Sequence, residues 1–344
     1  MKFGMQVGYS GAGIDDSVEQ AKLADELGFH SIWTAEAYGS DAITPLVWMG
    51  AHTKNVQLAT GIMQMPARTP AMTAMTAATL DALSGGRFIC GIGLSGPQVV
   101  EGWHGVPYGK PLVKTREYIE ILRAIWKREK PLEFSGEHYQ IPFAGAGATG
   151  LGKPLKSILH PRPDIPIVVA AIGPKNIALS AEIADGLLPA FFNPYKAKEV
   201  FGEPIKDGQA KRSADLRPAS EFDVICGCMV MVTDDVPSAL NFVKPGLALY
   251  IGGMGARGRN FYNDLACRYG FEKEAKEIQD LYLDGKKKEA MAAVPDELAD
   301  ATCLVGSKER IRDRFEVWKE SPATVMLLGG RDRATFEMML ELGA

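Results

Sequence analysis

Short apolar runs alternate with helical patterns along most of this 344-residue chain, and this alternation constrains the fold more than any other feature. A strand followed by a helix and a further strand is the unit from which parallel sheets are built. Strands are predicted at residues 1–7, 31–34, 56–61, 87–92, 165–171, 186–189, 222–232 and 324–328. Eight strands in this pattern favour a closed (β/α)8 TIM barrel over an open, doubly wound α/β sheet.

Helices are predicted between the strands, at residues 16–27, 44–52, 70–84, 115–127, 176–184, 194–211 and 332–342. Two insertions interrupt the repeat. One follows the fourth strand, at residues 131–162, and contains a short hairpin around residues 134–139 and a glycine-rich loop. The other is a mostly helical segment at about residues 234–300. A barrel with such insertions accounts for residues 1–344 as a single domain.

Composition and charge narrow the class of protein. With 46% hydrophobic and 23% charged residues and a net charge of -4, the chain is typical of a globular protein that binds neither nucleic acid nor a membrane. Its start lacks the apolar core of a signal peptide, and no run approaches the roughly 20 apolar residues of a membrane span. Cys226 and Cys228 share one face of a predicted strand, and we interpret the cysteines as reduced core residues. The expected location is cytoplasmic.

Two glycine-rich motifs are misleading. Gly91–Gly96 matches G-x-G-x-x-G, but Pro97 follows, and we expect no helix there to complete a dinucleotide-binding unit. Gly147–Lys153 approaches a P-loop, yet Pro154 stands where Ser or Thr would hold magnesium. The histidines lack metal-ligand spacing, so no metal site is predicted.

Reactive groups of a barrel gather where its strands end. Glu36 directly follows the second strand, so it is a candidate proton donor or acceptor, with a surface acid or a helix-capping partner as the alternative. Asp41 lies on the same loop. After the fifth strand, Gly173, Pro174, Lys175 and Asn176 open a helix whose free N–H groups suit a phosphate.

Four segments together resemble the luciferase-like monooxygenase superfamily, and within it the branch dependent on coenzyme F420, an 8-hydroxy-5-deazaflavin. They are residues 33–46, 58–62, 80–88 and 102–105, and the 171–174 turn and the 304–306 segment extend the likeness. The resemblance implies a TIM-barrel oxidoreductase that transfers a hydride between F420 and an organic substrate.

The resemblance also implies site residues. Gly61 and Ile62 fall where the family places a non-prolyl cis peptide behind the middle ring of the cofactor. The loop along the ribityl phosphate corresponds to Gly93, Leu94, Ser95, Gly96 and Val100, and the phosphate turn to Ala171, Ile172, Gly173, Pro174, Lys175 and Asn176. Several relatives carry His after the acid at position 36, but this chain has Ala37, so Glu36 or Tyr38 would have to supply a proton.

Other features remain open between function and packing. Met63, Trp103, His104 and Tyr108 are expected to shape a substrate pocket, although each could equally belong to the core or a lid. The loop at residues 144–153 is a candidate cover that excludes water. A homodimer is expected. The leading rival is an FMN-dependent monooxygenase that uses molecular oxygen, and a rival of another class is a non-catalytic cofactor carrier.

Overall fold

The computed structural model describes residues 1–9 and 15–343. All eight predicted barrel strands are present: β1 (Lys2–Tyr9), β2 (Ser31–Ala35), β3 (Gln57–Thr60), β5 (Phe88–Gly93), β8 (Ile167–Ala170), β9 (Gly186–Leu188), β10 (Asp223–Val232) and β12 (Val325–Gly329). Their order in the sheet is β10-β12-β1-β2-β3-β5-β8-β9, and β9 pairs again with β10. The order returns to its start, so the predicted (β/α)8 barrel is confirmed.

By its internal contacts the chain divides into two compact units. The N-terminal unit comprises residues 7–170 and 183–186, and the C-terminal unit comprises residues 1–6, 171–182 and 187–344. Strands β1 and β9 therefore contribute residues to both units.

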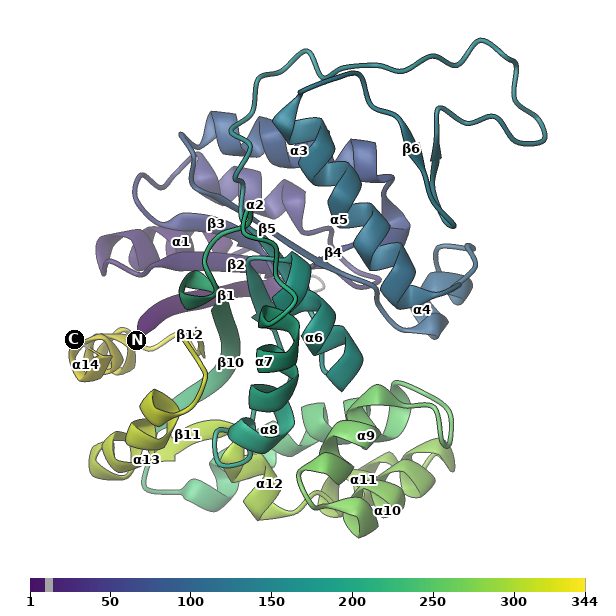
Figure 1. The fold of residues 1–344 in the computed structure, drawn as a ribbon. Coiled ribbons are helices and arrows are strands. Elements are labelled where there is room, and N and C mark those ends of the chain that lie inside the picture. The colour runs from purple at the N-terminus through teal and green to yellow at the C-terminus, as the bar shows by residue number, and fades with distance from the viewer. Residues whose placement is uncertain (10–14, 344) are drawn as a thin grey trace. The chain divides into compact units, whose positions relative to one another are not determined.

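In the N-terminal unit, helices follow the strands, and all but α4 were predicted (Figure 1). They are α1 (Ser17–Glu26), α2 (Ile43–Gly50), α3 (Pro70–Leu83), α4 (Pro97–Gly102) and α5 (Pro111–Lys127). Parallel registers pair Trp33 of β2 with Ala59 of β3, and Ala59 in turn with Ile89 of β5. All three residues are buried, as expected for a parallel sheet covered by helices. A two-residue strand, β4 (Met63–Gln64), lies off this path and pairs with the end of β5.

The prediction that no helix starts at Pro97 is wrong, because α4 begins there. Proline suits the first helical position, where its fixed φ fits and no N–H is needed. The dinucleotide-binding interpretation is still excluded, because β5 lies between β3 and β8 in the closed barrel order.

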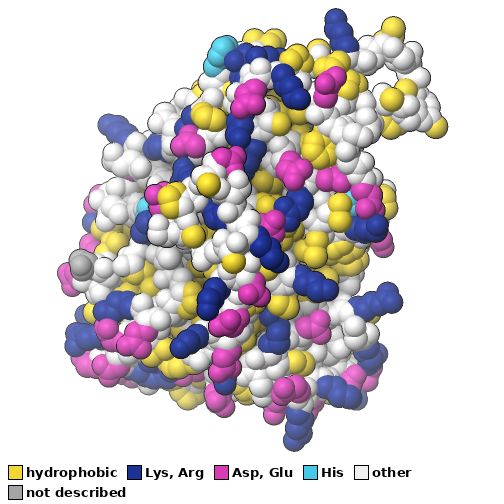
Figure 2. Space-filling view, in the orientation of Figure 1, with side chains coloured by type: hydrophobic (Ala, Val, Ile, Leu, Met, Phe, Trp, Pro, Cys, Tyr) yellow, Lys and Arg dark blue, Asp and Glu magenta, His cyan; other side chains and the backbone are white. Residues whose placement is uncertain are grey.

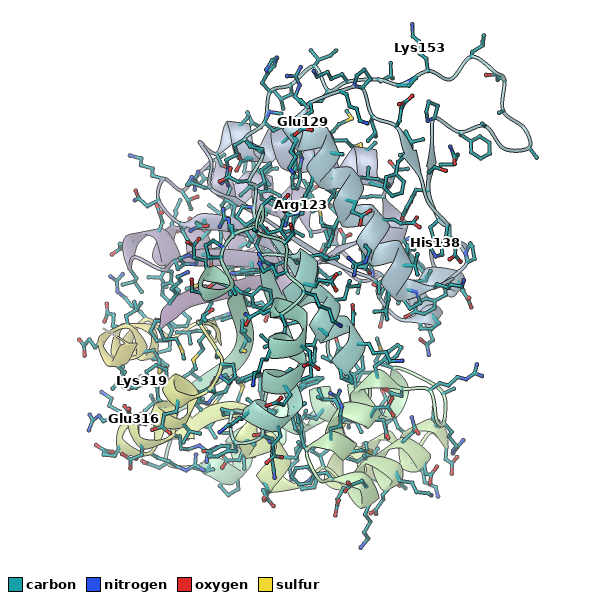
Figure 3. The ribbon with its side chains drawn as sticks, in the orientation of Figure 1. Arg123, Glu129, His138, Lys153, Glu316 and Lys319 are labelled. Carbon is teal, nitrogen blue, oxygen red and sulfur yellow. The ribbon has the colours of Figure 1, made fainter. Side chains whose placement is uncertain are left out.

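The insertion after β5 forms the predicted hairpin, β6 (Phe134–Ser135) with β7 (Gln140–Ile141). The buried carboxylate of Glu117 on α5 holds its turn by accepting the N–H groups of Glu137, His138 and Tyr139 at 2.6, 2.9 and 3.1 Å. Beyond the hairpin, residues 142–162 form a long loop on which Lys153 points outward (Figure 3). This exposed position agrees with the exclusion of a P-loop.

The C-terminal unit contains α6 (Pro174–Ile183), α7 (Glu203–Gln209) and the helical insertion α8 (Val236–Ala248), α9 (Phe261–Arg268), α10 (Glu272–Leu283), α11 (Lys287–Ala292) and α12 (Asp296–Ala301). It ends with α13 (Lys308–Glu320) and α14 (Arg333–Gly343). The predicted helix at 194–211 is instead a π-helical turn, Lys198–Gly202, that runs into α7. Strand β11 (Cys303–Gly306) was not predicted; it pairs in parallel with the second half of β10.

All five cysteines are free, and the assignment to the core is confirmed for Cys90, Cys226, Cys228 and Cys303, which are buried, whereas Cys267 is only partly buried. Burial raises the pKa of the Cys90 thiol to about 12 and also raises that of Cys226. Within residues 1–9 and 15–343, no group of metal-ligating side chains and no helix able to cross a bilayer is found. Figure 2 shows basic and acidic side chains intermixed on the visible face.

Candidate active site

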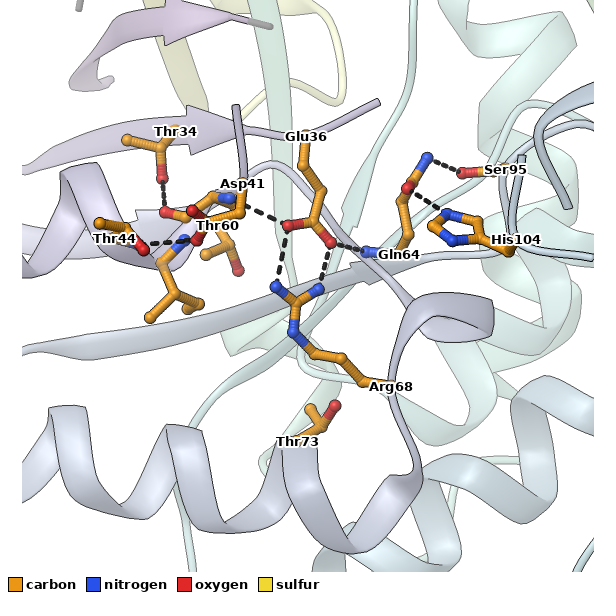
Figure 4. Close-up of polar contacts among 12 residues, drawn as sticks. Thr34, Glu36, Asp41, Thr44, Thr60, Gln64, Arg68, Thr73, Ser95 and His104 are labelled. Carbon is orange, nitrogen blue, oxygen red and sulfur yellow. Dashed lines mark hydrogen bonds and ion pairs between the residues drawn. The ribbon is translucent and has the colours of Figure 1, made fainter. Parts of the chain in front are cut away.

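Four hydrogen-bond donors surround the carboxyl group of Glu36, directly after β2 (Figure 4). The N–H of Ala42 lies 2.9 Å from Oε2, and the N–H of Gln64 lies 2.7 Å from Oε1. The Arg68 guanidinium contacts both oxygens, with Nη2 3.0 Å from Oε2 and Nη1 against Oε1. Only 8% of Glu36 is exposed. Because every partner donates, the arrangement suits a carboxylate and offers no acceptor for a proton.

Glu36 thereby connects segments that are apart in the sequence. Its carboxylate joins the start of α2, strand β4 and the residue after the short 3₁₀ turn Met65–Ala67. Its own N–H donates to the carbonyl of Ile62 at 3.3 Å. Arg68 was not predicted as a site residue. It could have been recognised from the sequence, because it is the only charged residue between Lys54 and Asp81.

The Gly61–Ile62 peptide is cis, which confirms the expectation from the family resemblance. The N–H of Gly61 donates to the carbonyl of Thr34 on β2 at 2.6 Å. On the neighbouring strand, a Cβ on Gly93 would lie 2.9 Å from Cδ1 of Ile62. The glycine at position 93 therefore allows the Ile62 side chain to lie directly against the end of β5.

A second polar group adjoins this bulge. Gln64 is 3% exposed; its Nε2 donates to Oγ of Ser95 at 2.8 Å, and its Oε1 lies 2.8 Å from Nε2 of His104. Ser95 has φ 60°, in the left-handed region that few non-glycine residues adopt. Gln64 thus joins two residues that the sequence assigned separately to cofactor and substrate, and it was itself not predicted as a site residue.

The other proposed positions in this unit differ in exposure. Tyr38 and Trp103 are 59% and 66% exposed, whereas Met63 and Val100 are 1% exposed and belong to the core. Burial raises the pKa of Tyr108. Leu94 is half-buried, and Gly96 is the residue before α4.

Asp41 caps the start of helix α2, which is the alternative to a catalytic role that the sequence allowed for an acid on this loop. Its Oδ1 accepts the N–H groups of Ile43 and Thr44, both at 2.8 Å, at the start of α2. Burial alone would raise the pKa of Asp41, but the hydrogen bonds from Thr44 and Ile43 and the charge of Arg68 outweigh it and lower the pKa.

In the C-terminal unit, the proposed phosphate turn opens α6 as predicted. Ala171 is buried, Gly173 accepts the N–H groups of Asn176 and Ile177 at 3.0 and 2.9 Å, and Pro174 and Lys175 are exposed. No heavy atom lies within 4 Å of a Cβ built on Gly173, so the space beside the turn is open.

Arg268, at the end of α9, reaches this turn. Its Nη2 donates to the carbonyl of Ile172 at 2.6 Å. Its Nη1 and the Oδ1 of Asn176 are buried without a hydrogen-bond partner among the described residues. Burial lowers the pKa of Arg268. An anion at the start of α6 would supply the acceptor that Nη1 lacks. Arg268 was not predicted as a site residue, since it lies in a helical insertion without a recognisable motif.

Comparison with known proteins agrees with this fold. Residues 1–324 match the family model for luciferase-like monooxygenases. The chain is 47% identical over 330 residues to a Mycobacterium tuberculosis protein named as a proposed coenzyme F420-dependent oxidoreductase, covering 95% of this chain and 94% of that protein.

Two solved structures have the same fold. The coenzyme F420-dependent tetrahydromethanopterin reductase from Methanopyrus kandleri matches with a TM-score of 0.77 and 23% identity, over 98% of this chain and 96% of that one. The FMN complex of the oxygenating constituent of 3,6-diketocamphane monooxygenase from Pseudomonas putida matches with a TM-score of 0.62 and 18% identity, over 99% and 96%.

The chain is therefore an oxidoreductase built on a (β/α)8 barrel. It belongs to the luciferase-like monooxygenase family.

Proposed function

We propose that this enzyme transfers a hydride between coenzyme F420 and a small organic substrate. The observation that carries the choice of cofactor is the 47% identity, over nearly the whole chain, to a relative named for F420. The cis Gly61–Ile62 bulge and the open α6 turn support the proposal, because they supply a backing for a flat ring and donors for a phosphate.

Each unit contains residues that suit one part of such a cofactor. In the N-terminal unit, Gly61 and Ile62 would contact the ring, and the loop Gly93–Gly96 would lie along the ribityl chain. In the C-terminal unit, Gly173, Lys175 and Asn176 would hold the phosphate, and Arg268 has a buried N–H that needs an acceptor. A bound deazaflavin would supply a carbon, C5, that accepts or donates a hydride.

Glu36 acts in this proposal as a positioning residue in place of the proton relay expected from the sequence. Its four donors hold the carboxylate in one orientation and fix the β4 segment that follows Ile62. Tyr38, which is largely exposed, and His104 are then our candidates in this unit for exchanging a proton with a substrate.

Equilibrium titration with F420 and with FMN, followed by fluorescence, tests the choice of cofactor. We expect tight binding of F420 and weaker binding of FMN. The similar structure with bound FMN supports the alternative function, an oxygen-dependent monooxygenase. Tighter binding of FMN than of F420 would favour that alternative. If F420 binds tightly but no member of a broad substrate panel oxidises its reduced form, the result favours a non-catalytic cofactor carrier.

We also propose a homodimer. The outward residues Val47 and Trp48 of α2 and Met72 and Met75 of α3 are exposed and uncharged, with Trp48 62% exposed. Neighbouring α1 and α5 present charged outward residues such as Lys22 and Glu120. An apolar surface of this kind is matched best by a second copy of itself. Sedimentation velocity should show a dimer that Met75→Lys weakens. The cytoplasmic location stays a prediction.

A further inference from the structure

We infer that Gln64 fixes the tautomer of His104 and that the bare Nδ1 of His104 is the proton-transfer atom of the reaction; this inference rests on the proposed function. A proton-transfer group is needed because position 37, where several relatives have His, is Ala in this chain. Glu36 is not free for this role, since its carboxylate is fully hydrogen-bonded.

The position of Gln64 is fixed from two sides. Its N–H donates to Oε1 of Glu36 at 2.7 Å, and in the parallel register of β4 and β5 it pairs with Gly93. With only 3% of the residue exposed, the side-chain amide is held by its protein partners. Figure 4 shows the amide between Ser95 and His104.

The hydrogen bonds of the amide then select the tautomer. Nε2 of Gln64 donates to Oγ of Ser95, so Oε1 is the atom that meets the imidazole. An amide oxygen only accepts, and Nε2 of His104 at 2.8 Å must therefore carry the proton. In a neutral imidazole, Nδ1 is then an acceptor.

The same contacts place His104 beside the proposed ring site. Gln64 follows Ile62 by two residues, and the Ile62 side chain lies against Gly93. Ser95, the other partner of the amide, belongs to the loop assigned to the ribityl chain. His104 is half-buried and stands next to the exposed Trp103.

The proton step balances with the hydride step. A bound deazaflavin would take up the hydride that the carbon of an oxidised substrate loses, and Nδ1 of His104 would take the proton from the adjacent oxygen or nitrogen. In the reverse direction, the imidazolium returns that proton as the carbon gains the hydride. The Nε2–H···Oε1 hydrogen bond to Gln64 stays in place throughout and keeps the ring oriented.

His30 provides an internal control in the same unit. Its Nε2 lies 3.1 Å from Nε2 of Gln57, an amide nitrogen that can only donate, and its Nδ1 lies 3.2 Å from Oγ of Ser31. The geometry therefore gives His30 the opposite tautomer, with the proton on Nδ1.

The test is ¹⁵N NMR of the full chain labelled at histidine, with His104 assigned by comparison with His104→Gln. We expect an unprotonated Nδ1 in His104 and an unprotonated Nε2 in His30. Gln64→Leu should return His104 to the mixture of tautomers seen in a free histidine side chain, while Gln64→Glu, which retains an acceptor, should preserve the wild-type pattern. Gln57→Leu should change His30 alone. The opposite tautomer at His104 would overturn the inference, because it would mean that the amide is reversed.

Addition of F420 separates this inference from the proposed function. We expect the Nδ1 resonance of His104 to shift as F420 binds, while the His30 resonances stay unchanged. If fluorescence shows binding and His104 does not respond, the inference fails and the proposed function stands. If F420 does not bind, the proposed function fails. With any substrate that turns over, His104→Ala should lower kcat by about 10²- to 10⁴-fold, and added imidazole should restore part of the rate.

Discussion

Replacing Glu36 by glutamine separates a positioning role from a proton relay without knowledge of the substrate. Each carboxylate oxygen accepts two hydrogen bonds: Oε1 from Gln64 and Arg68, and Oε2 from Ala42 and Arg68. A glutamine has one oxygen and one NH₂ group. In either orientation, the NH₂ group must face two donors, and Arg68 loses its counter-charge.

The size of the effect follows from burial. The side chains of Glu36 and Arg68 are 6% and 18% exposed. Removing one partner of a fully buried pair costs about 3–5 kcal/mol. Because Arg68 retains some contact with water, we expect Glu36→Gln to lower the free energy of unfolding by about 2–4 kcal/mol.

Urea denaturation monitored by circular dichroism measures this change. The matched control is Glu19→Gln, which breaks the surface pair with Lys22, where the side chains are 77% and 48% exposed, and should cost about 0–1 kcal/mol. The double variant Glu36→Gln/Arg68→Gln should lose less than the sum of the two single variants, because the pair is coupled. If Glu36→Gln is as stable as the wild type, the positioning role is refuted.

Three further predictions concern other parts of the chain. Arg268→Met should weaken F420 binding by about 10- to 150-fold, the worth of a hydrogen bond to a charged group, and leave binding of the phosphate-free deazaflavin unchanged in a fluorescence titration. Gly93→Ala should weaken the binding of F420 and of the phosphate-free deazaflavin about tenfold in the same titration, because the added Cβ would lie 2.9 Å from Cδ1 of Ile62. Asp25 accepts the N–H groups of Lys54, Asn55 and Val56; burial raises its pKa, but these bonds and Arg87 lower it overall, so Asp25→Asn should destabilise the protein at neutral pH in urea titrations.

Each of these predictions has its own control. Arg257→Met, at a surface pair with Asp280, should not alter F420 binding, and equal losses with both deazaflavins would contradict a phosphate contact by Arg268. Gly102→Ala introduces a Cβ with no atom within 4 Å and should leave cofactor binding unchanged. If Gly93→Ala also leaves cofactor binding unchanged, Gly93 does not belong to the site. The lowered pKa of Asp25 means that its carboxylate stabilises the fold at pH values above its unfolded-state pKa, which is near 3.9. This stabilisation is lost as the pH falls through the folded-state pKa, so the wild type and Asp25→Asn should have the same free energy of unfolding in acid. A difference independent of pH would contradict the assignment.

The alternation of apolar and helical segments was sufficient to predict the barrel, since strands such as β2 and β5 are buried along their whole length and read as short apolar runs in the sequence. The same reasoning missed β11 and placed no helix at Pro97. The β11 run is only four residues long and follows an insertion, and the α4 helix is six residues long, so neither carries a readable period.

For the candidate site, local sequence identified the cis bulge and the turn before α6, because both depend on neighbouring residues and on a family pattern. Only the tertiary structure decided the role of Glu36. Its partners Gln64 and Arg68 come from segments 28 and 32 residues away, and Arg268 lies 96 residues from the Ile172 carbonyl that it contacts. Hydrogen bonds across such separations depend on how strands and helices pack, and no local pattern records them. The sequence by itself therefore determined the barrel and the turn that opens α6, while packing decided which side chains are held in place by hydrogen bonds.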